Sequence, residues 1–231
     1  MSIHDGHRMR LRERFLQEGL DNFNELQALE LLLFYCMPRK DTNPIAHALL
    51  DRFKTYDAVL DASRKELMEV PGVGEGAATF LSLLKPAWRY YKVKQKENGV
   101  PLTNVTECGN YMLPYFLNRD VETVFLLCLD AKSKVISCRM IGEGSINSAS
   151  VPIRKIVETA INANASSVVL AHNHPSGVAI PSPEDIQTTR RLGKALHAVE
   201  IILVDHLVVA GNDFVSIAQS GAYSYRDCQD F

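Results

Sequence analysis

The chain has 231 residues, of which 46% are hydrophobic and 23% charged, with a formal net charge of −2 at pH 7. This composition is that of a globular protein, the length suits two domains, and the small net charge excludes binding of polyanions by bulk electrostatics. The sequence predicts neither a secretory signal nor a membrane-spanning helix, because it lacks apolar runs of the required kind and length. The five cysteines are odd in number and lack C-x-x-C pairing, which predicts reduced thiols and a cytoplasmic protein.

Helices dominate the first part of the chain, up to about residue 98. Apolar residues recur there at helical spacing in several segments. The predicted helices cover residues 8–17, 25–35, 44–53 and 77–91. The composition becomes polar in the segment Glu97–Pro101, which we interpret as a linker. We therefore predict an all-α domain over residues 1–98.

The sequence VPGVG, which contains Gly72 and Gly74, looks like the turn of a helix-hairpin-helix. Its glycines allow a tight turn, and free backbone amides at the start of the next helix could hold a phosphate group. Lys85, Arg89 and Lys92 follow at spacings that align them along one helix face, which favours a sequence-nonspecific contact with DNA. The alternative is an ordinary solvated face, since acidic residues are about as numerous as basic ones in this half.

Strands and helices alternate in the second half of the chain. Predicted strands cover residues 124–129, 135–141, 168–171, 201–209 and 214–217, and predicted helices cover 153–162 and 183–197. The segment Asp130–Lys134 predicts a hairpin turn between the first two strands. This alternation predicts an α/β fold, a mixed sheet flanked by helices, over residues 103–231.

Two histidines, His172 and His174, end the apolar strand predicted at 168–171. Residues i and i+2 of a strand point to the same face, so both imidazoles should project together. Asp185 follows in the segment SPED, and two imidazoles with one carboxylate form the ligand set of a catalytic zinc site that leaves a fourth position open for water. The same segment is also a good helix start, with Ser182 as N-cap, so Asp185 could serve only as a cap.

The spacing H-x-H-x(7)-S-x-x-D, formed here by His172, His174, Ser182 and Asp185, resembles the JAMM motif of MPN/JAB-domain metalloproteases. The fuller segments AHNHPSG and PSPEDI, with a later Asp-His pair, resemble the RadC family more specifically, and the resemblance extends over nearly the whole chain. It implies a JAB domain preceded by a helical region with a helix-hairpin-helix. It also implies one zinc ion per chain, held by the two histidines and Asp185, and a protein or peptide substrate.

The resemblance further implies two catalytic groups. Glu122, just before the first predicted strand, matches the glutamate that takes a proton from the metal-bound water, and Ser182 would donate to the developing oxyanion. Glu143 is the alternative base. His206, in the Asp-His pair, lies in an apolar run, so it is either a core histidine or a support for a metal-binding histidine.

The leading hypothesis is therefore a zinc-dependent hydrolase that cleaves a peptide or isopeptide bond. A DNA-associated accessory protein with a structural metal is the competing hypothesis, and a metal-dependent nuclease with the same ligands is a third. Neither the substrate nor the oligomeric state follows from the sequence.

Overall fold

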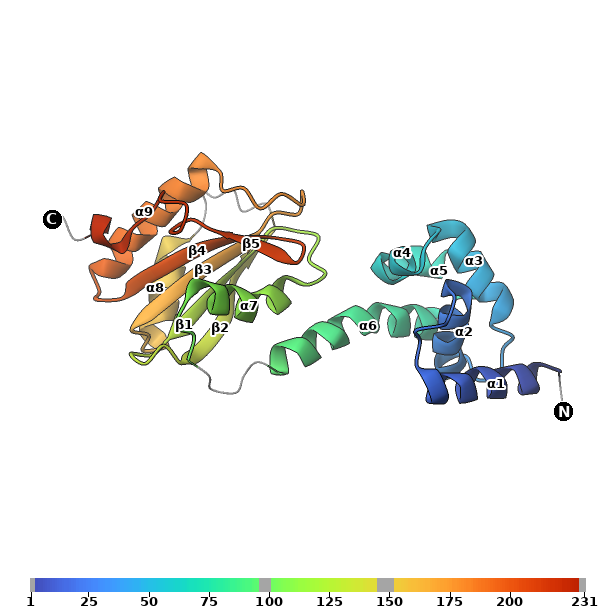
Figure 1. Ribbon diagram of the computed structural model, residues 1–231. Helices are drawn as coiled ribbons and strands as arrows, with labels where there is room; N and C mark the ends of the chain where they lie inside the picture. Colours follow the sequence, from blue (N-terminus) through green and yellow to red (C-terminus); the bar gives the residue numbers. More distant parts are fainter. Residues whose placement is uncertain (1–2, 96–100, 145–151, 229–231) are drawn as a thin grey trace. The chain divides into compact units, whose positions relative to one another are not determined.

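The computed structural model describes residues 3–95, 101–144 and 152–228 (Figure 1). The chain divides into two compact units, Met1–Trp88 and Arg89–Phe231, and each has its own apolar core. The predicted linker at Glu97–Pro101 falls almost entirely outside the described residues. The predicted domain limits, 1–98 and 103–231, therefore stay a prediction.

The N-terminal unit is helical, as the spacing of its apolar residues predicts. It contains α1 (Ile3–Glu18), α2 (Glu25–Cys36), α3 (Asn43–Phe53), α4 (Tyr56–Asp61), α5 (Arg64–Met68) and most of α6 (Glu75–Lys94). The start of α2 illustrates the local cause: the Asn24 side chain accepts a hydrogen bond from the Gln27 amide, and the Gln27 side chain accepts one from the Asn24 amide. This capping box satisfies amides that have no partner inside the helix. Leu29, Leu33 and Leu49 are fully buried in the core that the helices share.

The C-terminal unit holds the predicted α/β domain. Its elements after α6 are α7 (Val105–Phe116), β1 (Thr123–Leu129), β2 (Val135–Glu143), α8 (Ile153–Asn162), β3 (Ser167–Asn173), α9 (Pro183–His197), β4 (Ile202–Ala210), β5 (Asp213–Ser216) and the short 3₁₀ helix η2 (Tyr225–Cys228). The turn between β1 and β2 forms as predicted, because the Asp130 carboxylate accepts hydrogen bonds from the Lys132 and Lys134 amides, each at 2.8 Å.

Within the described residues, five strands form one mixed sheet in the order β2-β1-β3-β4-β5. Only β3 and β4 pair in parallel, and the remaining neighbours are antiparallel. In the β1–β3 ladder Val124 lies opposite His172. This register places the residues just before β1 beside the end of β3, where the two predicted metal-binding histidines are found.

Helices cover both faces of the sheet (Figure 1). Ile156 of α8 and Leu192 and Leu196 of α9 pack with the side chains of one face, which include Leu126, Val168 and Leu203. Met112 and Phe116 of α7 pack with those of the other face, which include Leu127, Val169 and Leu207. Because both faces are covered, β1 is buried along its whole length, which explains its unbroken apolar run.

Helix α7 is a helix that the sequence analysis did not predict. It contains Gly109 and Pro114, both poor helix formers, so its local sequence signal is weak. Gly109 is required by packing: a Cβ atom there would lie 2.1 Å from Cζ of Phe214 on β5. The helix is therefore stabilised mainly by its contact with the sheet.

Among the described residues, none of the helices combines the length and the apolar character needed to span a bilayer.

Candidate metal centre

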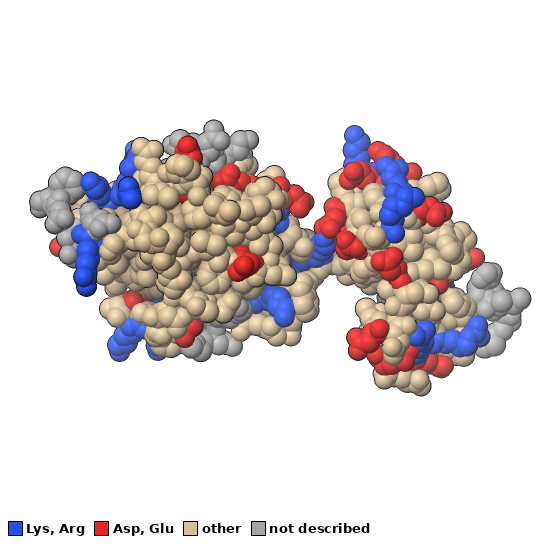
Figure 2. All heavy atoms as spheres, turned by 45° about the horizontal axis from the view of Figure 1, so that its top comes forward, with Lys and Arg blue, Asp and Glu red and all other residues tan. Residues whose placement is uncertain are grey.

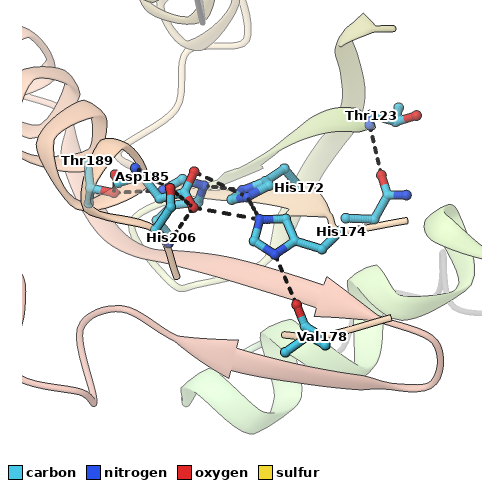
Figure 3. A network of polar contacts seen from close by, with 9 residues as sticks. Thr123, His172, His174, Val178, Asp185, Thr189 and His206 are labelled. Atoms are coloured by element: carbon cyan, nitrogen blue, oxygen red, sulfur yellow. Dashed lines mark hydrogen bonds and ion pairs between the residues drawn. The ribbon is translucent and has the colours of Figure 1, made fainter. Parts of the chain in front are cut away.

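The two histidines project together from the end of β3, as the strand geometry predicts (Figure 3). His172 is buried and His174, just beyond the strand, is half-buried. Asp185 reaches the same place from the first turn of α9, where it is also buried. Burial of polar side chains at one point requires that they satisfy one another or a ligand.

The facing atoms are close to one another. Nε2 of His172 lies 3.0 Å from Nε2 of His174 and 3.3 Å from Oδ1 of Asp185. Nε2 of His174 lies 3.7 Å from Oδ2 of Asp185. His172, His174 and Asp185 form a group whose candidate ligand atoms all lie within 4.8 Å of one another.

These separations suit a tetrahedral ion. Two ligand atoms that are each about 2.0–2.1 Å from zinc, at the tetrahedral angle, are roughly 3.3 Å apart. The observed distances from His172 Nε2, 3.0 and 3.3 Å, lie close to this value. A second observation agrees: Nδ1 of His174 lies 3.0 Å from the carbonyl oxygen of Val178. A carbonyl only accepts, so Nδ1 carries a hydrogen, and Nε2 is the nitrogen that a metal ion can bind. The residues present therefore fit a zinc ion.

Asp185 is placed so that it can serve both of the tasks that the sequence left as alternatives. Its Oδ2 accepts hydrogen bonds from the Ser182 amide at 2.8 Å and the Ser182 hydroxyl at 2.6 Å, while its own amide donates to Ser182 Oγ at 3.1 Å. This is the predicted capping box at the start of α9. Oδ1, by contrast, faces His172. The cap thus holds the carboxylate in place while one oxygen remains directed at the histidines.

The electrostatic surroundings keep Asp185 ionised. Its burial would raise the pKa of the carboxyl group, but the His172 side chain and the hydrogen bonds from Ser182 outweigh burial and hold the pKa well below its ordinary value. An ionised carboxylate is the form that binds a cation. The Ser182 hydroxyl, which was predicted as an oxyanion donor, here gives its hydrogen to Asp185.

Glu122 lies directly before β1, beside the end of β3. Partial burial raises the pKa of its carboxyl group, and charges on His172, Asp185 and His174 act on it as well, which places it within electrostatic reach of the group. Glu143, the alternative base, is exposed, and its Oε1 accepts a hydrogen bond from Arg119 at 3.1 Å. The two candidates therefore differ: charges of the histidine and aspartate group act on Glu122, whereas Glu143 has a guanidinium partner.

Asn173, between the two histidines, was not predicted to have a role. Its Oδ1 accepts from the Thr123 amide at 2.8 Å, and its Nδ2 donates to the carbonyls of Val121 at 3.2 Å and Arg119 at 3.3 Å. These bonds hold the backbone on both sides of Glu122 against the end of β3. The signal available in the sequence was a polar residue that points to the opposite side of the strand from both histidines.

His206, on β4, contacts the other ring nitrogen of His172. Nδ1 of His172 is 2.8 Å from Nε2 of His206, and Nδ1 of His206 is 2.7 Å from the hydroxyl of Thr189, which in turn donates to the carbonyl of Asp185 at 2.6 Å. Burial, followed by the nearby His172, lowers the pKa of His206 well below its ordinary value. No role was predicted for Thr189, because a threonine inside a helix is an ordinary residue.

The residues predicted to contact DNA lie apart from this group in the chain. Gly72 adopts a left-handed backbone (φ 88°) in the turn between α5 and α6, and both Gly72 and Gly74 are exposed. Lys85 forms an ion pair with Asp61, and Nη1 of Arg89 donates to the Leu117 carbonyl at 3.1 Å. Lys92 is half-buried on α6. On the face drawn in Figure 2, basic and acidic side chains are interspersed over the helical unit.

Comparisons with known proteins identify the family of this chain. The family model described as a RadC-like JAB domain matches residues 102–222. A UPF0758 protein from Fusobacterium nucleatum is 37% identical over 94% of this chain and 96% of its own length. UPF0758 proteins from Ruegeria pomeroyi and Vibrio cholerae are each 34% identical, over 93% and 91% of this chain and 96% and 94% of their own lengths.

Proposed function

The chain belongs to the RadC family of JAB-domain proteins, and from its site we propose that it is a zinc-dependent hydrolase that cleaves a peptide or isopeptide bond. The observation that carries the proposal is the convergence of two imidazole nitrogens and one carboxylate oxygen at the spacing of a tetrahedral ion. Three protein ligands leave a fourth position for water, which distinguishes a catalytic zinc site from a structural one with four protein ligands.

The proposed reaction assigns a separate task to each group. Zinc bound by His172, His174 and Asp185 would lower the pKa of a bound water toward neutrality and polarise the carbonyl oxygen of the substrate. The Glu122 carboxylate accepts one proton of the attacking water and gives it to the nitrogen of the leaving amine. The amide C–N bond breaks, water supplies the new C–O bond, and the products are a carboxylic acid and an amine.

Ser182 has a conditional role in this proposal. To donate to the oxyanion, its hydroxyl must turn from Oδ2 of Asp185 toward the substrate oxygen. The Ser182 amide also donates to Oδ2, so the carboxylate keeps one hydrogen bond from the cap when the hydroxyl turns. Rotation of this hydroxyl would free it to act as an oxyanion donor.

Metal analysis followed by a hydrolysis screen tests the proposal. We expect about one zinc per chain in the purified protein and cleavage of at least one member of a set of peptides and isopeptide conjugates. Glu122→Gln should retain the zinc and lose the cleavage. If the protein binds no divalent metal at any concentration, the proposed function is wrong. If the Glu122→Gln variant is active, Glu122 is not the base.

A second candidate function is sequence-nonspecific DNA contact by the N-terminal unit. The exposed turn with Gly72 and Gly74 at the start of α6 supports it, because free amides at a helix start attract phosphate. The partners of Lys85 and Arg89 argue against a free basic stripe. A salt titration of DNA binding, comparing the wild type with sign-reversed Lys85, Arg89 and Lys92, tests this candidate, and equal binding by both proteins rejects it. Incubation of labelled DNA with zinc or manganese tests the nuclease alternative.

For the compartment we propose the cytoplasm. All five cysteines are free thiols, and Cys108, Cys128 and Cys228 are buried. Burial raises the pKa of the Cys108 thiol to about 11, so this group is protonated and unreactive at neutral pH. Buried, unpaired thiols suit a reducing environment.

A further inference from the structure

We infer that Thr189 and His206 are positioning residues that fix the tautomer of His172 with its hydrogen on Nδ1, so that Nε2 is the nitrogen available to a metal ion. The inference rests on a chain of three hydrogen bonds that runs from the backbone carbonyl of Asp185 to the His172 ring (Figure 3). Its consequence for metal binding rests on the proposed function, whereas the tautomer itself does not.

The chain begins at the Asp185 carbonyl, which can only accept. The Thr189 hydroxyl lies one helical turn later and donates to this carbonyl at 2.6 Å. A hydroxyl has a single hydrogen, so the Thr189 oxygen has only lone pairs left for its second neighbour. That neighbour is Nδ1 of His206, at 2.7 Å. Nδ1 of His206 must therefore carry a hydrogen.

The same reasoning continues through the His206 ring. His206 is 2% exposed, and burial disfavours its charged form, so one of its two ring nitrogens carries the hydrogen. Because Nδ1 holds the hydrogen, Nε2 of His206 is an acceptor. It lies 2.8 Å from Nδ1 of His172, which must then be the donor. Nε2 of His172, which is directed at His174 and Asp185, is then the nitrogen available to a metal ion.

The opposite arrangement of hydrogens has a specific cost. It would place a hydrogen on Nε2 of His172, toward Oδ1 of Asp185, and each earlier hydrogen bond would reverse. Thr189 would then donate to His206, and the Asp185 carbonyl would lose the hydroxyl bond that it now accepts. Thr189 is fully buried, so water cannot replace that bond. The threonine on α9 therefore favours the form of His172 that can bind a metal.

This arrangement connects two ligands that come from different elements. Asp185 supplies a carboxylate oxygen to the proposed site, and its backbone carbonyl begins the chain that orients His172 on β3. Metal-binding histidines usually donate their second N–H to a carboxylate, a carbonyl or water. Here the acceptor is a second histidine, His206. Thr189 makes it an acceptor, because the Thr189 oxygen accepts the hydrogen that His206 carries on Nδ1.

Nitrogen NMR of the full-length, metal-free protein tests the tautomers directly. With ¹⁵N-labelled histidine at mildly alkaline pH, we expect Nδ1 to carry the hydrogen in both His172 and His206. His172→Gln and His206→Gln variants assign the signals. If either ring in the wild type carries its hydrogen mainly on Nε2, the inference is wrong. This measurement needs neither metal nor activity.

Zinc affinity, measured by competition with a chelator, tests the consequence. Thr189→Val keeps the shape of the side chain but removes the hydroxyl, and we expect a loss of about 10–100-fold in zinc affinity, as is typical when a partner of a ligand is removed. Thr189→Ser should restore most of the affinity. Thr159→Val is the matched control, because Thr159 on α8 makes the same type of bond, to the Lys155 carbonyl at 2.7 Å.

The outcomes separate this inference from the proposed function. A wild type with the expected tautomers that does not bind zinc refutes the metal site and leaves the inference standing. A Thr189→Val variant that binds zinc as tightly as the wild type refutes the inference and leaves the metal site standing. If Thr189→Val does not fold, the wild-type NMR spectrum decides alone.

Discussion

Asn173 holds the start of β1 through Thr123, fifty residues earlier in the chain: its Oδ1 accepts a hydrogen bond from the Thr123 amide at 2.8 Å. Thr123 is fully buried, so this amide has no access to water. The Nδ2 group of Asn173 completes the contact by donating to the Val121 carbonyl. One side chain thus attaches the segment that contains Glu122 to the strand that contains both histidines.

Replacing Asn173 with alanine should weaken the fold and, more strongly, the hydrolysis. The buried Thr123 amide loses its partner, which costs roughly 1–3 kcal/mol of unfolding free energy. Zinc should remain bound, but hydrolysis should fall about a hundredfold because Glu122 is no longer held in position. The measurements are denaturant unfolding, the zinc content and the rate of hydrolysis. A fully active alanine variant would contradict the assigned role.

Glu122 and Glu143 should respond differently to the same substitution. Glu122→Gln removes the proposed base, so hydrolysis should fall by about 10²–10⁴-fold while zinc content is unchanged. Glu143→Gln should have a small effect, because Glu143 is exposed and pairs with Arg119. Steady-state rates with matched zinc occupancy distinguish them. The reverse order of effects would make Glu143 the base.

Loss of one ligand should abolish metal binding and the stability that it confers. His174→Ala should reduce zinc from about one per chain to near zero, because two remaining ligands bind zinc weakly. A chelator should lower the melting temperature of the wild type and leave that of His174→Ala unchanged. His197→Ala is the control, since His197 lies at the other end of α9 and contacts Tyr225. An equal response of both variants to the chelator would argue against the site.

The metal-free protein should lose stability as the pH falls below about 6.5. Burial, followed by His172, lowers the pKa of His206 below that value, so the folded state holds this ring neutral. The unfolded state then binds more protons, and stability is present above the unfolded pKa and is lost as the pH falls toward the folded pKa. Unfolding curves at several pH values measure how steeply the free energy of unfolding depends on pH. His206→Gln should reduce this dependence and His197→Gln should not.

Two glycine substitutions test the packing of α7. Gly109→Ala places a Cβ atom against the Phe214 ring and should destabilise the C-terminal unit by about 1–3 kcal/mol. Gly76→Ala, in the first turn of α6, meets nothing within 4 Å and should be neutral or stabilising by up to about 1 kcal/mol. Thermal unfolding of both variants provides the comparison. Equal effects would mean that α7 does not depend on close contact with β5.

Much of the fold follows from local sequence patterns. The predicted ranges of α8 and α9 match the observed helices, and the predicted strand at 201–209 differs from β4 by one residue at each end. These elements have clear periodicity or long apolar runs, which depend only on neighbouring residues. Helix α7 escaped prediction because Gly109 and Pro114 weaken its local signal, while the sheet supplies the stabilising contact.

The candidate site could likewise be predicted from the sequence only in part. The alternation of a strand is enough to predict that His172 and His174 point together, and the helix-start pattern is enough to predict the Ser182 cap. Asn173 and Thr189 could not be predicted from spacing, because their partners are fifty and seventeen residues away. Nothing in the local sequence distinguishes them from ordinary polar residues.

The sequence by itself determined the chemical identity of the proposed ligands and the elements that present them, since both depend on residue type and short-range periodicity. Only the tertiary structure decided how those ligands are oriented and how Glu122 is held beside them. The reason is that the direction of a hydrogen bond depends on which donor and acceptor meet, and here β1, β3, β4 and α9 bring them together only when the sheet and its helices pack.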